Sequence, residues 1–175
     1  GFSNDPVGAP AWWVEGAAIV FPALFLNEYF YKLSYTQDHQ LRIDDGEYPF
    51  RVRNDWENHF LQTRKQMIVG EEGNCHLVGP KEEYRDTAIC DWFLMNVYLA
   101  YRTSYQTLFV DLLGDMWELG FDGSFQKHVG MSKEKFYDEY NDFMKEGDPD
   151  TPSPDGFFPD QTLNELVDFW AIDSG

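Results

Sequence analysis

Glu15 is the residue whose neighbours in the sequence most directly suggest chemistry. Every other residue between positions 11 and 26 is apolar or small, so a helix formed there would carry this single carboxylate into an apolar interior. Burial of an unpaired carboxylate costs on the order of several kcal/mol. We therefore expect Glu15 to be buried with a partner, which could be a cation such as Arg, a ring of hydrogen-bond donors, or a metal ion.

Gly16, the next residue, predicts a close packing contact. Glycine inside a helix is less favourable than alanine by about 1 kcal/mol, so a glycine in this position needs a compensating reason. Close approach of another segment to the helix backbone would supply that reason. We therefore expect a second element to pack directly against Gly16.

Histidines are few and do not form a metal-binding motif. The chain has four: His39, His59, His76 and His128. None begins a His-Glu-x-x-His sequence, the pattern that places two zinc ligands on one helix face. His59 falls on an expected helix near Glu57 and could ligate a metal, but a single histidine beside an acid is more typical of a surface residue.

Cysteines and clustered aspartates give weaker signals. Cys75 and Cys90 could form one disulfide or remain thiols, and the adjacent Cys75 and His76 lack the partner residues of a nucleophilic site. Three aspartates in a Pro-rich stretch vaguely resemble a calcium loop: Asp148, Asp150 and Asp155. Their spacing is not that of an EF-hand, so a solvated loop is the better interpretation.

The elements that would hold these residues are mostly helices. Pro10 suits the first turn of a helix that Pro22 would kink or divide. Apolar spacing then predicts helices from Asn54 toward residue 70, over 86–101, and over 103–119 with Gly120 at its end. A short helix over 124–129 ends at Gly130, and a further helix follows.

Other boundaries complete the expected organisation. Ser132 is placed to cap the helix that follows it. We expect one mainly α, bundle-like domain over residues 1–147, a Pro/Asp-rich linker or loop over 148–159, and a C-terminal helix over 160–175 that packs on the same domain. Alternating apolar residues around an Asp-Asp-Gly turn allow one short β-hairpin near residues 41–52.

Composition limits the classes of partner. The 175 residues include 31 acidic and 13 basic side chains, a formal charge of −18, and 18% are aromatic. So negative a surface repels nucleic-acid phosphates and anionic lipid headgroups, which argues against both as ligands. Residues 7–26 are long enough to span a bilayer, but Glu15 and two prolines argue for a buried helix instead.

Tryptophans are expected to be structural. Four of them fall within expected helices: Trp12, Trp13, Trp92 and Trp117. Large aromatic side chains contribute most to helical cores, so we interpret these four as core residues and not as a ligand platform.

A family resemblance gives Glu15 a more specific role. Residues 10–18, Pro-Ala-Trp-Trp-Val-Glu-Gly-Ala-Ala, resemble the Pro-x-Trp-hydrophobic-x-Glu-Gly-x-Ala segment of gluzincin-type zinc metallopeptidases, and residues 125–144 are similar to the C-terminal helical part of related peptidases. The resemblance implies that Glu15 is the third zinc ligand, with Trp12 and Gly16 packing around it. It also implies a peptide or protein substrate and weakly favours an extracytoplasmic location. In such a site zinc activates a water molecule that attacks the peptide carbonyl.

The resemblance is partial, because the family's His-Glu-x-x-His helix is absent from this sequence. Either that helix lies upstream of Gly1, or the chain descends from a peptidase and no longer binds zinc. On either interpretation this chain alone is expected to be inactive, with no catalytic residue and no zinc of its own.

Two other functions remain open from the sequence. The chain could be a non-catalytic helical module whose acidic face binds a basic protein. It could instead be a self-contained metal enzyme that combines Glu15 with its scattered histidines.

Overall fold

The computed structural model describes residues 8–29, 53–69 and 89–158. Within these ranges the chain is helical and has no strand, which confirms the mainly α fold class. The possible hairpin at 41–52, the C-terminal helix at 160–175 and Cys75 lie outside the described residues. No helix among those described is both long and apolar enough to cross a membrane.

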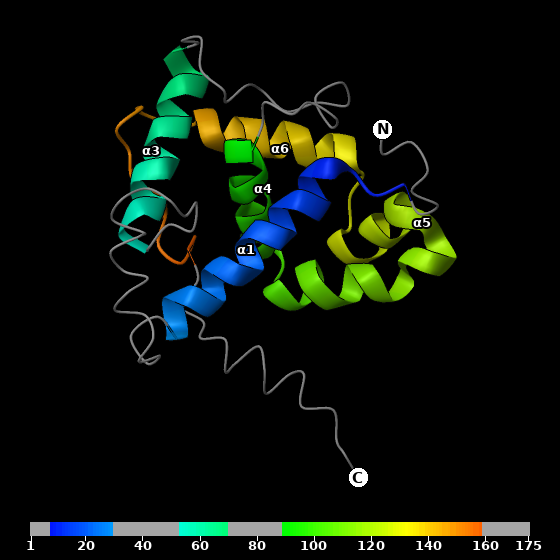
Figure 1. Ribbon diagram of the computed structural model, residues 1–175. Helices are drawn as coiled ribbons and strands as arrows, with labels where there is room; N and C mark the ends of the chain where they lie inside the picture. Colours follow the sequence, from blue (N-terminus) through cyan, green and yellow to red (C-terminus); the bar gives the residue numbers. More distant parts are fainter. Residues whose placement is uncertain (1–7, 30–52, 70–88, 159–175) are drawn as a thin grey trace.

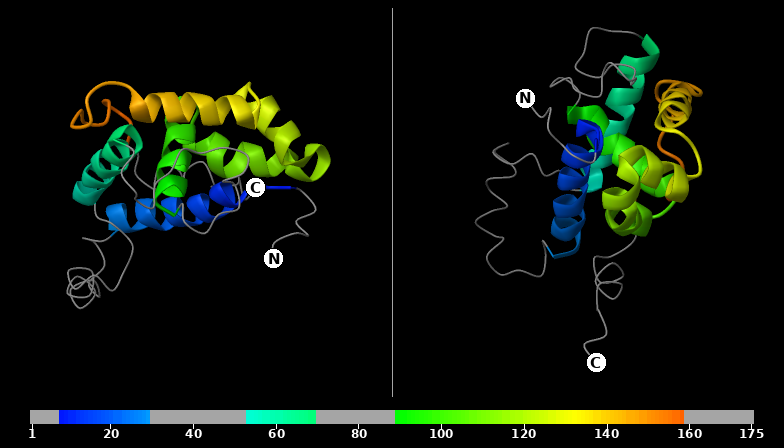
Figure 2. Two further views of the ribbon diagram at one scale, coloured as in Figure 1. Left: turned by 90° about the horizontal axis from the view of Figure 1, so that it is seen from above. Right: turned by 90° about the vertical axis from the view of Figure 1, so that its right-hand side faces the viewer.

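Helix α4 (Ile89–Arg102) lies at the centre of the fold. Seen from above in Figure 2, it is sandwiched between α1 (Ala11–Tyr29) on one side and α6 (Lys133–Lys145) on the other. Helix α3 (Arg53–Val69) lies at one end of this sandwich and α5 (Leu112–Val129) at the opposite end (Figure 1). The central position of α4 explains why its residues 92–100 are all buried.

Local sequence signals set several helix ends as expected. Helix α1 begins directly after Pro10 and continues through Pro22 as one helix, so Pro22 does not divide it. Ser132 caps α6, because its side chain accepts a hydrogen bond from the Lys135 backbone N–H. Gly130 ends α5 in a left-handed conformation at φ 79°, which glycine adopts without steric cost.

Gly120 divides α5 into two halves. Its φ of 68° and ψ of 172° are not helical, so the chain turns there and the second half folds back beside the first. The first half, Leu112 to Leu119, continues from a wider π-helical turn, η1 (Thr107–Asp111). The expected helix end at Gly120 is therefore confirmed, and the expected short helix at 124–129 is part of the second half of α5.

Aromatic side chains form the core in two groups. Around Trp12 pack rings from α5 and α6: Phe121, Phe125, Phe136 and Tyr137. At the other end, rings from α3, α4, α6 and the following loop pack together: Trp56, Phe60, Phe93, Phe143, Phe157 and Phe158. Tyr98 of α4 contacts Phe136 and Phe143, and so joins the two groups.

The Pro/Asp-rich stretch after α6 is an ordered loop fixed to α3. Glu57 accepts hydrogen bonds from the Ser153 backbone N–H at 2.7 Å and from its hydroxyl at 2.5 Å. Arg64 donates to the Thr151 carbonyl at 3.0 Å, and Phe157 is 1% exposed. Through residue 158, this stretch is therefore a packed surface loop and not a free linker.

Candidate functional site

Glu15 is exposed to solvent on α1, so the expectation that it is buried was wrong. The buried face of α1 is set by residues four positions apart: Trp12, Gly16, Val20 and Leu24. Glu15 lies on the opposite side with Val14, which is 44% exposed, and Phe21, which is 41% exposed. An apolar run around a helix does not reveal which side meets the core, and the contact with α4 made that choice.

Gly16 marks the point where α1 crosses α4. A Cβ atom added to Gly16 would lie 2.9 Å from the Trp92 carbonyl carbon and would also overlap the Asn96 side-chain nitrogen. The Asn96 amide donates hydrogen bonds to the Trp12 and Trp92 carbonyls, each at 2.8 Å. The close packing expected at Gly16 is confirmed, and its partner is α4.

Trp12 holds the start of α1 against α6. Its side chain is fully buried, and its indole N–H donates to the Tyr137 hydroxyl at 2.8 Å. Its ring also stacks on Phe136 with centroids 5.5 Å apart. Trp12 and Gly16 therefore both face inward as packing residues, and Glu15 points away from them.

The described residues contain no ready-made metal centre. Across 8–29, 53–69 and 89–158, no group of three or more His, Cys, Asp and Glu side chains is placed to hold a metal ion. Within the same ranges Glu15 makes no ion pair. A structural zinc site takes four protein ligands and a catalytic site three, so Glu15 cannot hold zinc with these residues alone.

The weaker candidates have structural roles. His59 is 7% exposed and its ring lies against Phe93, with centroids 6.1 Å apart, so it is not the surface residue that we expected. Asp148 accepts a hydrogen bond from the Asp150 backbone N–H at 2.9 Å, an arrangement that shapes a turn. The adjacent pair Cys75 and His76 lies outside the described residues, as does His39.

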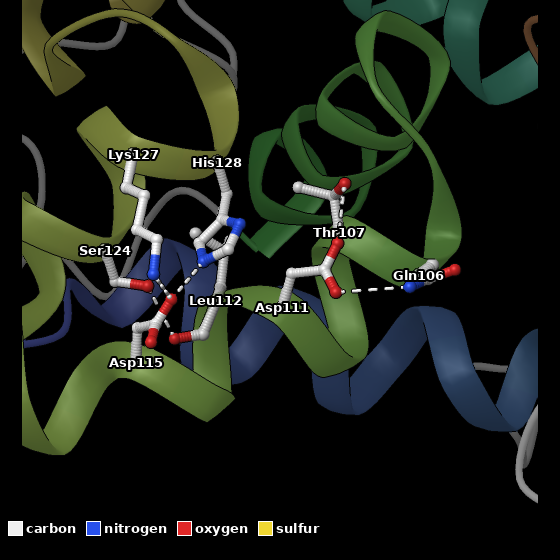
Figure 3. A network of polar contacts seen from close by, with 8 residues as sticks. All are labelled: Gln106, Thr107, Asp111, Leu112, Asp115, Ser124, Lys127 and His128. Atoms are coloured by element: carbon white, nitrogen blue, oxygen red, sulfur yellow. Dashed lines mark hydrogen bonds and ion pairs between the residues drawn. The ribbon is translucent and has the colours of Figure 1, made fainter.

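Sequence inspection missed a polar network that joins the two halves of α5 (Figure 3). Asp115 is on the first half of α5, and Lys127 and His128 are on the second half. Lys127 Nζ and His128 Nε2 each lie 2.5 Å from the same Asp115 oxygen, Oδ2. Hydrogen bonds from both side chains lower the pKa of Asp115, with Lys127 the larger cause. The buried Ser124 hydroxyl donates to the Leu112 carbonyl at 2.8 Å beside this network.

This network braces the bend at Gly120 and does not contain a Ser–His pair among the described residues. Ser124 is the hydroxyl drawn nearest to it, and that hydroxyl is buried and bound to a backbone carbonyl. A catalytic Ser–His pair needs a direct contact between the hydroxyl and the imidazole, and no such contact joins Ser124 and His128 among the described residues. The sequence hint to this network is an aspartate 12 positions before a lysine and 13 positions before a histidine, on the other side of Gly120.

An open groove of about 590 Å³ lies between α4 and α6. Its lining carries mixed charge: Tyr98, Arg102, Glu139, Asp142, Phe143, Lys145 and Glu146. Arg102 pairs with Glu139 at 3.1 Å, and Lys135 lies 3.6 Å from the same carboxylate. Two of the lining charges, those of Arg102 and Glu139, therefore neutralise each other.

Trp117 differs from the other tryptophans that the structure describes. Trp12, Trp13, Trp56 and Trp92 are between 0% and 7% exposed, whereas Trp117 is 81% exposed on the first half of α5. The expectation that Trp117 belongs to the core was wrong. Its neighbours Leu112 and Met116 face the core, so the helix turns Trp117 outward.

The chain was compared with protein-family models, curated proteins and solved structures. No protein-family model, curated protein or solved structure matches it.

Proposed function

We propose that this chain is the helical C-terminal part of a zinc-dependent peptidase of the gluzincin type, to which it contributes Glu15 as one zinc ligand. The observation that carries the proposal is the arrangement of the Trp-Trp-Val-Glu-Gly segment on α1. Trp12 and Gly16 are buried against α6 and α4, while Glu15 is presented to solvent. A carboxylate already paired in the core would not be free to bind a metal.

The surroundings of Glu15 agree with a covered position in a larger assembly of helices. Val14 and Phe21, on the same side of α1, are 44% and 41% exposed, and Ala18 between them is also exposed. Phe21 also contacts the Phe109 ring, with centroids 5.6 Å apart. Val14 and Ala18 are therefore the apolar residues of this face nearest Glu15 that another helix could cover. The metal-bearing element implied by the resemblance is the His-Glu-x-x-His helix.

Zinc does not fit the described residues by themselves. Among them, no group of three or more His, Cys, Asp and Glu side chains could hold a metal ion. The remaining ligands must therefore come from residues that the structure does not describe or from outside this sequence. In the proposed role the chain supplies one ligand and the packing that orients it, and the hydrolytic chemistry belongs to the complete site.

The test uses the protein expressed from its whole coding sequence. We expect an in-frame His-Glu-x-x-His upstream of residue 1 and one bound zinc per chain, measured by elemental analysis of the purified protein. Glu15→Gln should reduce bound zinc and abolish peptide hydrolysis. Once zinc has been removed from both proteins with a chelator, their thermal unfolding temperatures should be equal, because bound zinc itself stabilises a fold and Glu15 is exposed in this chain. Asp138→Asn, which removes an exposed carboxylate from α6, is the matched control.

Two results would overturn the proposal. One is a coding sequence without the upstream motif. The other is a Glu15→Gln protein that keeps full zinc content and full activity, since this would show that its carboxylate is not a ligand.

A further inference from the structure

The first half of α5 exposes an apolar surface to solvent. It consists of Leu113, Gly114 and Trp117, which we call the Trp117 face. Leu113 and Trp117 are one helical turn apart and are 49% and 81% exposed. Gly114 is also exposed and is next to Leu113 in the helix, beside Trp117 on the helix surface. A large indole held in water is unusual, because tryptophan contributes most of its stabilisation when it is buried.

Gly114 adds an independent sign that something approaches this face. Glycine in a helix interior is less stable than alanine. At Gly16 the reason for glycine is visible, because a Cβ would overlap α4. At Gly114 a Cβ would meet nothing within 4 Å, and its φ lies outside the left-handed range. Nothing in the described fold therefore requires glycine at position 114, whereas close approach of a partner backbone would.

The charge around the Trp117 face selects the kind of partner. Glu118, beside Trp117, is exposed, whereas Asp115 on the same half-helix is already paired with Lys127 and His128. The whole chain has a formal charge of −18, so two copies repel each other strongly. A basic partner would be attracted by the negative charge of the chain. Its cations could also bind over the face of the exposed Trp117 indole ring.

We propose that the Trp117 face binds a basic amphipathic helix of a partner protein. The apolar side of that helix packs on Leu113 and Trp117, and its backbone lies close to Gly114. Its Lys or Arg side chains contact the Trp117 ring and the Glu118 carboxylate. This surface is on α5 and Glu15 is on α1, so the inference does not depend on the proposed peptidase role.

The test is a titration of the full chain with a synthetic amphipathic helical peptide of Lys and Leu, followed by isothermal calorimetry at about 0.15 M salt. We expect saturable binding with one peptide per chain. Trp117→Ala should weaken it by about tenfold or more, as expected for removal of a central aromatic anchor. Glu118→Gln should weaken binding more at low salt than at high salt, because it removes a charge contact.

Gly114→Ala gives the most discriminating result. The added methyl group should raise the unfolding temperature of the free chain, because it favours the helix, and should also weaken peptide binding. No loss of folding can produce that combination. Val69→Ala is the matched control, because Val69 is 51% exposed on α3 and lies outside the proposed surface. It should leave peptide binding unchanged.

Three results would overturn the proposal. Equal peptide affinity of the original chain and Trp117→Ala would exclude this face as the binding site. Equal affinity for a peptide of Glu and Leu would exclude a basic partner. Sedimentation equilibrium that shows a dimer of the original chain, lost in Trp117→Ala, would assign the face to a second copy of the chain instead.

Discussion

Gly16 of α1 lies directly against the backbone of Trp92 in α4, where a Cβ atom would come within 2.9 Å of the Trp92 carbonyl carbon. The contact brings the two helices close enough for Asn96 to donate hydrogen bonds to a carbonyl of each. The Trp92 backbone and the hydrogen-bonded Asn96 amide leave no room for a larger residue at position 16. This crossing therefore sets the orientation of α1, and with it the outward position of Glu15.

Gly16→Ala should destabilise the fold. Its methyl group forces α1 and α4 apart and strains a packed core, a change that costs about 1–3 kcal/mol or more. Urea denaturation should show a lower free energy of unfolding. Gly114→Ala makes the same substitution at an exposed helix position and should stabilise the chain by up to about 1 kcal/mol. If both variants changed stability in the same direction, the close contact at Gly16 would be contradicted.

Arg64 should be needed to hold the loop after α6. Arg64 is 4% exposed. Its guanidinium donates hydrogen bonds to four backbone carbonyls, those of Phe143, Met144, Glu146 and Thr151. Burial lowers the pKa of Arg64, and the charges of Glu146 and Glu57 act in the opposite direction. Arg64→Met should reduce the free energy of unfolding by about 3 kcal/mol, because it leaves these carbonyls without their shared donor.

Hydrogen exchange would locate the effect of Arg64→Met. Amide protons of the loop from Glu146 to Phe158 should exchange faster, while those of α4 change only with global stability. Arg64→Lys keeps the charge but not the planar set of donors, so we expect it to restore only part of the loss. Full restoration by Lys would show that charge alone matters at this site.

Asp115 should make stability depend on pH in the acid range. Lys127 and His128 lower its pKa in the folded chain, so its contribution is fully present above the unfolded value, about 3.9, and is lost as the pH falls through the lower folded value. The free energy of unfolding of Asp115→Asn should therefore fall less steeply than that of the original chain below about pH 4. Asp138→Asn is the control, and parallel curves for Asp115→Asn and the original chain would contradict the prediction.

Tyr105→Phe should be neutral or stabilising. The Tyr105 hydroxyl is buried and has no hydrogen-bond partner among the described residues, and burial raises its pKa. An unsatisfied buried hydroxyl costs about 1–3 kcal/mol, and phenylalanine keeps the ring that stacks on Phe109. Thermal and urea denaturation should show equal or greater stability. A loss of more than about 1 kcal/mol would show that the hydroxyl has a partner.

Much of the fold could be predicted from local residues. Pro10 and Ser132 set the starts of α1 and α6, and Gly120 and Gly130 mark the bend and the end of α5. These signals act within one helical turn, so they can be recognised without knowledge of the rest of the chain. The close contact at Gly16 could also be predicted, because an unexplained glycine in a helix is a local observation.

The candidate site could be predicted only in part. The sequence singled out Glu15, but it did not show that this carboxylate points to solvent, nor that His59 is buried against Phe93. It also did not predict the meeting of Asp115 with Lys127 and His128, because that contact depends on how far α5 folds back at Gly120. Each of these outcomes depends on the packing of one helix on another.

The sequence by itself determined the starts of α1 and α6, the bend and the end of α5, and that something packs against Gly16. Propensity, capping and glycine geometry are short-range effects, and they are encoded in neighbouring residues. Tertiary structure alone decided which side of each helix faces outward. Helices α1 and α5 both have apolar residues on more than one side, and the contacts with α4 and α6 buried one side of each. Glu15 and Trp117 were left at the surface.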